Sequence, residues 1–421
     1  MDDLRFDTLS RVFATAPTRR TALAGLAALL SRAFLAPADA NAQSRTCRPL
    51  GDRCFPSRGL DCCRGECRSG RCRCPEGQRR CGNRCLRKGR TCRRARKRCG
   101  TNQHRCQGRC ISKNACCGGC SKGQFCRHGG CCDVPSSAAL KAALEPGGPD
   151  TIRLCPKTTY RGTFTITRPV TVIGAGATSS VLDGARSGTV VTITDAVSET
   201  VRLHGLGIVN GLSAEHGGGI LARAPLTLTQ CRVANNEASV AGGGILTVAA
   251  LTLIDSVVTR NRSTNLGGGI DARGGGAIVT LRGSSRVEHN EADLLSGGGL
   301  NVQVGAGVTL RDKSQVRHNR AQRGGGISIT GSAFARLHDT SRVEGNAATI
   351  HGGGIASEWS QLELHGSSRI TGNVSLAGAD SGGGIYTYES EVVLPDAAMV
   401  AGNTPDQCWP AIPTGDGGTC S

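Results

Sequence analysis

Asp271, Arg273 and Glu358, in the C-terminal part of the chain, are the side chains whose types best suit catalysis. Two carboxyl groups can serve as general acid and base on a glycosidic bond, and they then lie about 5–9.5 Å apart. Clustered acids beside a basic group could instead hold calcium for an elimination reaction. Whether these residues can meet depends on the elements that carry them.

Those elements are repeats. A Gly-Gly-Gly-Ile motif occurs seven times at intervals of 25, 25, 30, 27, 28 and 30 residues, with Leu300 replacing Ile in the fourth copy. A fixed motif at such a period predicts stacked structural repeats rather than independent domains. The motifs begin at Gly217, Gly242, Gly267, Gly297, Gly324, Gly352 and Gly382.

Each repeat carries a second marker, an apolar residue followed three positions later by Asn. Alternating apolar stretches such as Leu226-Thr-Leu lie between the two markers and predict strands, three per repeat. Coils stacked at about 4.8 Å would pair every strand with the coils above and below. Glycine permits a positive φ at one corner, and Asn is expected to tolerate a left-handed turn and to form a ladder. The ladder residues are Asn236, Asn261, Asn290, Asn319, Asn346, Asn373 and Asn403, with Asn210 expected to mark the preceding turn.

The paired Gly-Gly-x-Ile and apolar-x-x-Asn motifs resemble the repeats of polymorphic outer-membrane proteins, within the pectin-lyase-like superfamily. The resemblance covers roughly residues 133–405. It implies an all-β, right-handed parallel β-helix of about ten coils over residues 133–407. No segment resembles the C-terminal membrane barrel of autotransporter relatives. Residues 408–421 are expected to form a cap closed by a Cys408–Cys420 disulfide, with Trp409 covering the last coil.

In enzymes of this superfamily the substrate groove runs along the outside of one sheet. If the Ile of each motif points inward, the residues one and three positions later point outward. This stripe ends in aromatic residues, which could stack on sugar rings, so the candidate ligand contacts are Asn301, Gln303, Trp359, Tyr386 and Tyr388. An ordinary solvated sheet face is the alternative. The outward pairs are Leu221/Arg223, Leu246/Val248, Asp271/Arg273, Asn301/Gln303, Ser328/Thr330, Ala356/Glu358 and Tyr386/Tyr388.

The same placement argues against catalysis. Asp271 and Glu358 would lie three coils apart, roughly 14 Å at about 4.8 Å per coil, which is too far for a glycosidase pair. Asp271 with Arg273 is a fragment of a lyase site, and calcium is expected only if the protein is a lyase. His289 and His318 have no Ser or Cys nucleophile evident beside them. No cofactor or metal is predicted otherwise.

The N-terminal part has a different composition. Of the 23 Cys, 19 lie between Cys47 and Cys132, and residues 47–132 hold 23 Lys and Arg against 4 Asp and Glu, a difference of +19. The whole chain contains only 3% aromatic residues, which argues against an ordinary globular core. Residues 43–132 are therefore interpreted as a separate basic module in which disulfides substitute for a core.

The order C-x6-C-x7-CC-x3-C-x4-C from Cys47 to Cys72 resembles a knottin. The resemblance implies the pairs Cys47–Cys63, Cys54–Cys67 and Cys62–Cys72, one of 15 possible pairings. Residues 74–85 and 99–110 share a Cys-rich pattern that indicates an internal duplication. Because 19 is odd, one module cysteine is expected to pair outside the module, with Cys155 as a candidate. Zinc binding around Cys117-x2-Cys120 is the disfavoured alternative.

A dense basic run in the module could bind an anionic cell-surface polymer or polysaccharide. The alternative is a solvated surface on a disulfide scaffold. Binding of single-stranded nucleic acid is not favoured, because few aromatic residues interleave with the basic ones. The run consists of Arg90, Arg93, Arg94, Arg96, Lys97 and Arg98.

Residues 1–42 have a basic start, the short apolar run Ala22–Leu30 and small residues at the exit, as in a cleavable export signal. Thr18-Arg19-Arg20-Thr21-Ala22-Leu23 resembles a twin-arginine signal, and a general secretory signal is the alternative. No transmembrane helix is expected in the mature chain, and the many cysteines favour an oxidising, extracellular or cell-surface location.

Three hypotheses follow. The leading one is a secreted or surface-associated adhesion and binding protein, with the basic module on a polyanionic surface and the β-helix face on glycans. The second is a polysaccharide lyase or glycoside hydrolase. The third is a structural component that binds other proteins.

Overall fold

A computed structural model describes residues 66–68, 71–74, 76, 78–81, 84–87, 101–106, 109–112, 116, 120–121, 124–395, 399–415 and 419–420. The chain divides into two compact units, residues 1–98 and 99–421. The described residues of the first unit form two antiparallel hairpins, β1 (Glu66–Arg68) with β2 (Arg71–Arg73) and β3 (Gln78–Cys81) with β4 (Arg84–Arg87).

The predicted duplication in the Cys-rich segment is visible as a repeated hairpin. In the second unit, β5 (Gln103–Cys106) pairs with β6 (Arg109–Ser112) in the register that joins β3 and β4. Gln78 lies opposite Arg87 as Gln103 lies opposite Ser112. A further hairpin, β7 (Phe125–Arg127) with β8 (Gly130–Cys132), precedes the repeats.

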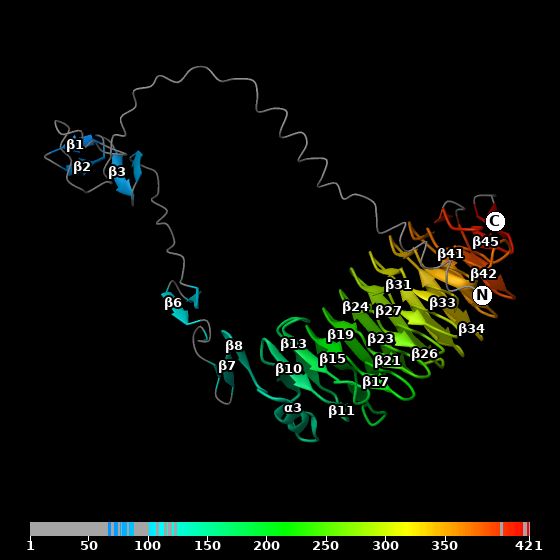
Figure 1. The fold of residues 1–421 in the computed structure, drawn as a ribbon, viewed down its shortest axis with the longest axis horizontal. Coiled ribbons are helices and arrows are strands. Elements are labelled where there is room, and N and C mark those ends of the chain that lie inside the picture. Colours follow the sequence, from blue (N-terminus) through cyan, green and yellow to red (C-terminus); the bar gives the residue numbers. More distant parts are fainter. Residues whose placement is uncertain are drawn as a thin grey trace, which may run out of the picture. The chain divides into compact units, whose positions relative to one another are not determined.

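The repeats form a parallel β-solenoid, which confirms the predicted all-β coiled fold (Figure 1). Each complete coil contributes one strand to each of four parallel sheets, in the chain order sheet 1, sheet 2, sheet 3, sheet 4. Sheet 1 comprises β9 (Thr151–Arg153), β12 (Thr171–Ile173), β15 (Val201–His204), β19 (Leu226–Thr229), β23 (Leu251–Ile254), β27 (Ile278–Arg282), β31 (Gly307–Leu310), β35 (Phe334–Leu337), β39 (Gln361–Leu364) and β43 (Glu391–Val393).

Sheet 2 also has ten strands. They are β10 (Thr158–Arg161), β13 (Ser180–Asp183), β16 (Gly207–Val209), β20 (Arg232–Ala234), β24 (Val257–Thr259), β28 (Arg286–Glu288), β32 (Gln315–Arg317), β36 (Arg342–Glu344), β40 (Arg369–Thr371) and β44 (Val400–Ala401).

Sheet 3 is short and has seven strands, whereas sheet 4 has ten. In the Gly-motif coils each strand of sheet 4 begins at the Ile of the motif, or at Leu300 in the fourth copy. The strands of sheet 3 are β17 (Leu212–Ser213), β21 (Glu237–Ala238), β25 (Arg262–Ser263), β29 (Glu291–Ala292), β33 (Arg320–Arg323), β37 (Ala347–His351) and β41 (Val374–Ser375). Those of sheet 4 are β11 (Phe164–Ile166), β14 (Val191–Ile193), β18 (Ile220–Ala222), β22 (Ile245–Thr247), β26 (Ile270–Arg273), β30 (Leu300–Gln303), β34 (Ile327–Thr330), β38 (Ile355–Glu358), β42 (Ile385–Tyr388) and β45 (Cys408–Trp409).

The alternating sequences build the core. In β19 and β23 the two Leu residues are buried and the intervening Thr is not, so one face of each strand points into the coil. Aliphatic side chains at the same position of successive coils, such as Val258, Val287 and Val316, lie in register and are fully buried. This stacking buries an inner face that no single coil could bury alone.

The asparagines form the predicted ladder. The Oδ1 of Asn319 accepts from the backbone N and the Nδ2 of Asn290, at 2.9 and 3.0 Å, and the Nδ2 of Asn319 donates to Asn346 Oδ1 at 3.0 Å. The same bonds link each ladder residue from Asn236 to Asn403, which ends on Gln407. The ladder satisfies buried polar groups at this corner of every coil.

Two details of the corner predictions were wrong. The left-handed residue is the one before each ladder asparagine, for example His289 at φ 55° and His318 at φ 52°, because the ladder amide must point inward to reach the next coil. Asn210 occupies this left-handed position, and Gly211 takes the ladder place by donating its backbone N to Asn236 Oδ1. The ladder bonds also interrupt the backbone pairing between coils. The residues after each ladder position therefore form a separate short strand in sheet 3, which gives four strands per complete coil instead of the three expected.

Helix α3 (Ser137–Leu144) lies at the N-terminal end of the solenoid and contacts β10 and β11 (Figure 1). Ser136 caps the helix, its Oγ accepting from Ala139 N at 3.2 Å, and Leu140 and Leu144 are buried. The helix therefore covers the open end of the first coils, which would otherwise expose unpaired strands.

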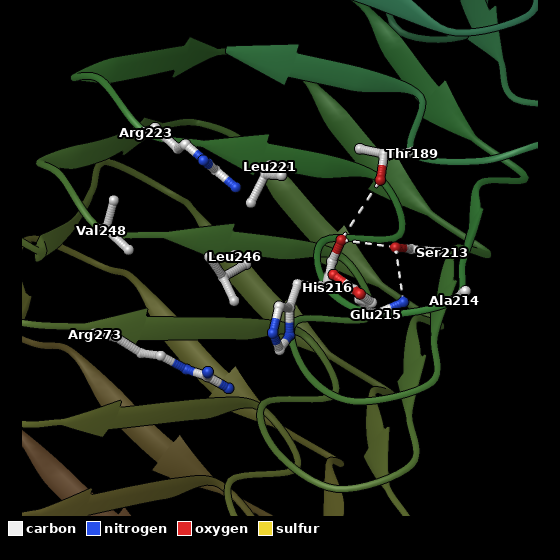
Figure 2. Close-up of a pocket in the computed structure, with 10 residues that line it drawn as sticks. All are labelled: Thr189, Ser213, Ala214, Glu215, His216, Leu221, Arg223, Leu246, Val248 and Arg273. Atoms are coloured by element: carbon white, nitrogen blue, oxygen red, sulfur yellow. Dashed lines mark hydrogen bonds between the residues drawn. The ribbon is translucent and has the colours of Figure 1, made fainter. Parts of the chain in front are cut away.

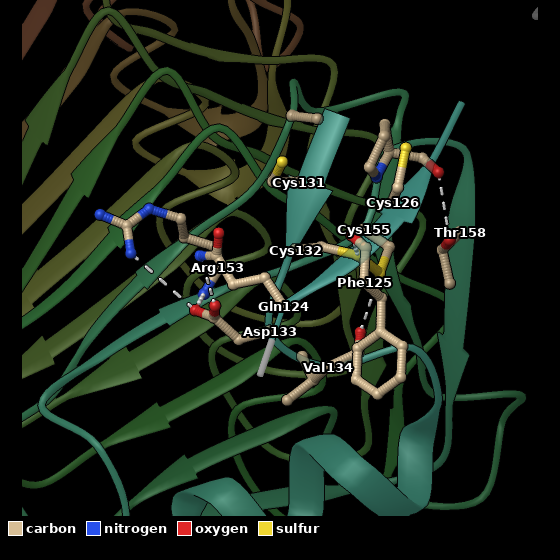
Figure 3. The surroundings of a disulfide bond; sticks show 12 residues. Gln124, Phe125, Cys126, Cys131, Cys132, Asp133, Val134, Arg153, Cys155 and Thr158 are labelled. Atoms are coloured by element: carbon tan, nitrogen blue, oxygen red, sulfur yellow. Dashed lines mark hydrogen bonds and ion pairs between the residues drawn. A yellow bond between two sulfur atoms is a disulfide. The ribbon is translucent and has the colours of Figure 1, made fainter. Parts of the chain in front are cut away.

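A disulfide between Cys132 and Cys155 joins hairpin β7–β8 to the first coil (Figure 3). It confirms the expectation that a module cysteine pairs with Cys155. Asp133 beside it accepts from Arg153 N at 2.7 Å, and the buried Tyr160 hydroxyl donates to Val134 O at 2.7 Å. These contacts fix the last described hairpin of the Cys-rich segment against the coil.

The C-terminal end is closed by the expected Cys408–Cys420 disulfide and a hairpin of β46 (Ile412–Pro413) and β47 (Thr419–Cys420). Ile412 and both cysteines are buried there. Trp409 does not cover the last coil as predicted. It lies in register beside Tyr386 in sheet 4 and is 38% exposed, because it occupies an outward position of the last strand.

Candidate binding face on sheet 4

The outer face of sheet 4 consists of two columns of side chains with different surroundings. The first column, one residue after the Ile or Leu of each motif, runs in register through Leu221, Leu246, Asp271, Asn301, Ser328, Ala356 and Tyr386. The second column, three residues after each Ile, is Arg223, Val248, Arg273, Gln303, Thr330, Glu358 and Tyr388. Both columns point away from the core, as predicted.

The first column is nevertheless mostly buried, because the glycine corner folds back over it. A Cβ on Gly267 would lie 2.7 Å from the Cβ of Asp271, and one on Gly297 would lie 2.7 Å from the Cα of Asn301. Only glycine leaves room for this approach, and its positive φ makes the turn. Asn301 is consequently buried and does not face solvent, contrary to its prediction as a ligand contact, whereas Gln303 in the second column is partly exposed.

Asp271 is a fully buried carboxylate on this outer face. It is ion-paired with Arg273 and accepts from Asn301 Nδ2 at 2.6 Å. Burial raises the pKa of the Asp271 carboxyl above its ordinary value, although Arg273, Asn301 and His216 all act in the opposite direction. Arg273, at 29% side-chain exposure, keeps part of its guanidinium accessible.

The first three Gly-motif coils form a groove of about 660 Å³ (Figure 2). Leu221, Leu246 and Val248 form the floor of the groove. Val248 lies toward one side of this floor, and Arg223 and Arg273 lie on that same side. The opposite rim is the loop between β17 and β18, where Glu215 and His216 line the groove. Ser213 Oγ donates to His216 O at 2.9 Å and accepts from Glu215 N at 3.3 Å, which holds this rim in place.

The last coils of the same face carry aromatic side chains. Trp359 is 53% exposed and Tyr388 47%, and their rings meet edge to face with centroids 5.1 Å apart. Trp359 Nε1 donates to Glu389 Oε2 at 2.8 Å. Tyr386 stacks on His351 with centroids 4.3 Å apart and lies in register with Trp409. The predicted aromatic candidates Trp359, Tyr386 and Tyr388 are therefore gathered on one end of the face.

The catalytic candidates are separated. Asp271 and Glu358 are three strands apart and belong to different columns, so only Asp271 and Arg273 meet. Among the described residues, the one group of three or more metal-ligand side chains close enough to share an ion is Cys116, Cys120 and Cys131. These sulfurs belong to the disulfides Cys116–Cys126 and Cys120–Cys131, which leaves no thiolate for zinc.

Several predictions concern residues outside the described ranges. The knottin-type pairs each include at least one such cysteine, the basic run Arg90–Arg98 lies between described segments, and the export signal precedes them. Within the described part of the chain, no helix combines the length and apolar character needed to cross a membrane.

Comparison with protein-family models, with curated proteins and with solved structures gives no match for the chain in any of the three.

Sequence reasoning missed residues that border the outer face of sheet 4 and lie in the segment just before a Gly motif. His216 and His351 both immediately precede a Gly run, and Glu215 precedes His216. The only signal was their fixed place beside the motif, since this position is Ala, Leu, Ser or Arg in the other coils. Trp409 was noticed but assigned to the end of the solenoid.

Proposed function

We propose that this protein is an exported binding protein whose solenoid holds glycans on the aromatic end of sheet 4. The observation that carries the proposal is the cluster of Trp359, Tyr388 and Trp409, three large aromatic side chains between 38% and 53% exposed on one face. Exposed aromatic clusters usually mark an interaction site, because apolar surface of this size is otherwise buried.

The arrangement suits sugars. Edge-to-face rings present two planes in different directions, and the Trp359–Glu389 hydrogen bond restricts rotation of the indole. Glu358, in the same coil as Trp359, and Thr330, which pairs with Glu358 from the preceding coil, are second-column residues that can hydrogen-bond to sugar hydroxyls. Aromatic planes beside a few polar groups are the usual composition of a small-ligand site.

The polyanion role of the Cys-rich module is part of the same proposal. Its support is the excess of 19 Lys and Arg over Asp and Glu within residues 47–132, which equals the net charge of +19 for the whole chain. Such a concentration of charge attracts anionic polymers at long range. Export is supported by the N-terminal leader and by the disulfides, and membership of the pectin-lyase-like superfamily by the repeat motifs.

Binding without catalysis is favoured over a lyase or hydrolase by the state of Asp271. A carboxylate fully buried under a glycine corner and paired with Arg273 cannot reach a glycosidic oxygen or a hydrated calcium ion without rearrangement. Glu358 has no acidic partner in its own column.

The test is retention of the full-length protein on a panel of immobilised neutral and acidic polysaccharides. We expect Trp359→Ala and Tyr388→Ala to abolish retention on the bound glycan, whereas Leu376→Ala, which removes an equally exposed apolar side chain elsewhere, leaves it unchanged. Retention that is identical in all three variants would overturn the glycan site. Unsaturated or reducing ends released during incubation would overturn binding without catalysis in favour of the enzyme hypothesis.

The module is tested separately on heparin. Replacing the six residues of the basic run by Gln should lower the salt concentration at elution, because exposed charge–charge attraction is screened by salt. Replacing six exposed arginines of the solenoid is the matched control. Equal elution shifts in both variants would contradict a specific role for the module.

A further inference from the structure

The groove at the start of the face differs chemically from the aromatic end. Leu221, Leu246 and Val248 provide an aliphatic floor, and no Phe, Tyr or Trp is among the described residues that line the groove. The floor offers a sugar ring neither an aromatic plane to stack on nor a hydrogen-bond partner, so hydroxyl groups placed against it would be buried at a cost. The floor therefore selects an apolar ligand, in contrast to the aromatic end three coils further along.

The charges of the groove are asymmetric. Arg223 lines the groove and is exposed. It has no ion-pair partner among the described residues. Arg273 uses its Nε for Asp271 and keeps part of its guanidinium accessible. Both arginines lie on the side of Val248, whereas Glu215 lies on the opposite rim (Figure 2). An anionic group is attracted to the arginine side and repelled from the Glu215 side.

We propose that this groove binds a medium-chain aliphatic carboxylate, with the hydrocarbon chain on Leu221, Leu246 and Val248 and the carboxylate on Arg223. A guanidinium holds a carboxylate through two parallel hydrogen bonds, which fixes the head group at the arginine side. The groove volume of about 660 Å³ is within the range of small-ligand sites. The site uses none of the aromatic residues of the proposed glycan site, so it stands independently of that function.

Asp271 contributes by positioning Arg273. The buried carboxylate holds the Arg273 Nε beneath the groove, so that the side chain cannot swing into solvent. Asn301 in turn holds Asp271 through its 2.6 Å hydrogen bond. The buried first column thereby orients a charged group of the exposed second column.

Titration calorimetry of the full-length protein with octanoate and decanoate tests the site. We expect saturable binding that tightens from octanoate to decanoate and weakens as salt is raised. Arg223→Gln should weaken it about tenfold, the loss of one charge-assisted contact. Arg282→Gln, which removes an exposed arginine of sheet 1, should leave it unchanged.

Two further measurements keep the test decisive. Octanol has the chain without the charge, so it should bind the wild type and Arg223→Gln equally weakly, and Glu215→Gln should tighten octanoate by removing the repulsion. Absence of saturable binding of either carboxylate, or equal affinity of Arg223→Gln and Arg282→Gln, would overturn the proposal. A circular-dichroism spectrum and an unfolding midpoint equal to those of the wild type show that Arg223→Gln is folded, so this result does not depend on the glycan proposal.

Discussion

The asparagine corner and the outer face of sheet 4 belong to the same coils but follow opposite rules. Along the corner the same residue recurs in seven consecutive coils, and each copy satisfies the next through its amide. Along the second column of the face no residue type occurs more than twice. The difference indicates that the ladder requires repetition, because each amide must meet an identical amide in the next coil, whereas the second column makes no such shared contact and varies from coil to coil.

The largest expected effect comes from breaking the corner. Asn319→Ala removes the acceptor for Asn290 N and Nδ2 and leaves those buried donors unpaired, so we expect a loss of about 4 kcal/mol of unfolding free energy. Denaturant unfolding followed by circular dichroism measures it. Asn265→Ala, at a partly exposed position outside the ladder, should change stability by less than about 0.5 kcal/mol. Equal losses in both would show that the ladder is not the stabilising element.

The next effect tests the buried column beneath the face. Arg273→Gln leaves the Asp271 carboxylate buried without its cation, and we expect a loss of about 3 kcal/mol at neutral pH. Asp271→Asn should cost clearly less, because the partly exposed Arg273 can be solvated. Thermal unfolding of both variants against the wild type provides the comparison, and a larger loss for Asp271→Asn would contradict the argument.

The same pair predicts a pH dependence. Because burial raises the folded-state pKa of Asp271 above the ordinary value of 3.8, the protonated acid is favoured by folding, and this contribution is present at low pH and lost as the pH rises through the folded-state pKa. Removing the Arg273 charge raises that pKa further. The stability deficit of Arg273→Gln should therefore shrink as the pH falls toward 4. His216 also acts on the Asp271 carboxyl and is unchanged in this variant. A deficit independent of pH would contradict this origin.

A smaller loss is expected at the glycine corner. In Gly298→Ala the new methyl group overlaps the carbonyl oxygens of Arg320 and Gly325, and we expect a loss of about 2 kcal/mol. Gly275→Ala is the control, since its nearest neighbour would be Gly305 O at 3.9 Å. Unfolding midpoints that coincide for the two variants would show that the corner tolerates a side chain.

The smallest effect on stability is expected at the aromatic end. Trp359→Ala removes a half-exposed ring and its contact with Tyr388, so the loss should be less than about 1 kcal/mol. Glycan retention should nevertheless disappear. A variant that loses several kcal/mol would assign Trp359 to the framework instead of the binding face.

The repeat motifs were sufficient to predict the coiled fold, because Gly and Asn mark corners whose spacing is visible in one sequence. They also placed the outward residues correctly, since side chains alternate along a strand. The burial of Asp271 and Asn301 could not be foreseen from alternation, because it depends on how far the Gly267 and Gly297 corners fold back over the sheet. The capping helix had a local signal, Ser136 followed by Leu140 and Leu144, that was hidden beside stronger repeats.

The groove was harder to predict for a related reason. Its floor residues Leu221 and Leu246 were assigned outward, but the rim formed by Glu215 and His216 comes from a loop whose sequence does not repeat. Loops of variable sequence carry no periodic signal, so their contacts are known only once the coils are stacked.

The link between Cys132 and Cys155 closes a covalent ring around residues 133–154, which include the capping helix. A protease that nicked this helix would leave the chain in one piece on a denaturing gel without reductant, and two fragments would separate only after reduction. The Cys-rich segment thus has two independent tethers to the coils, and losing either one alone does not release it.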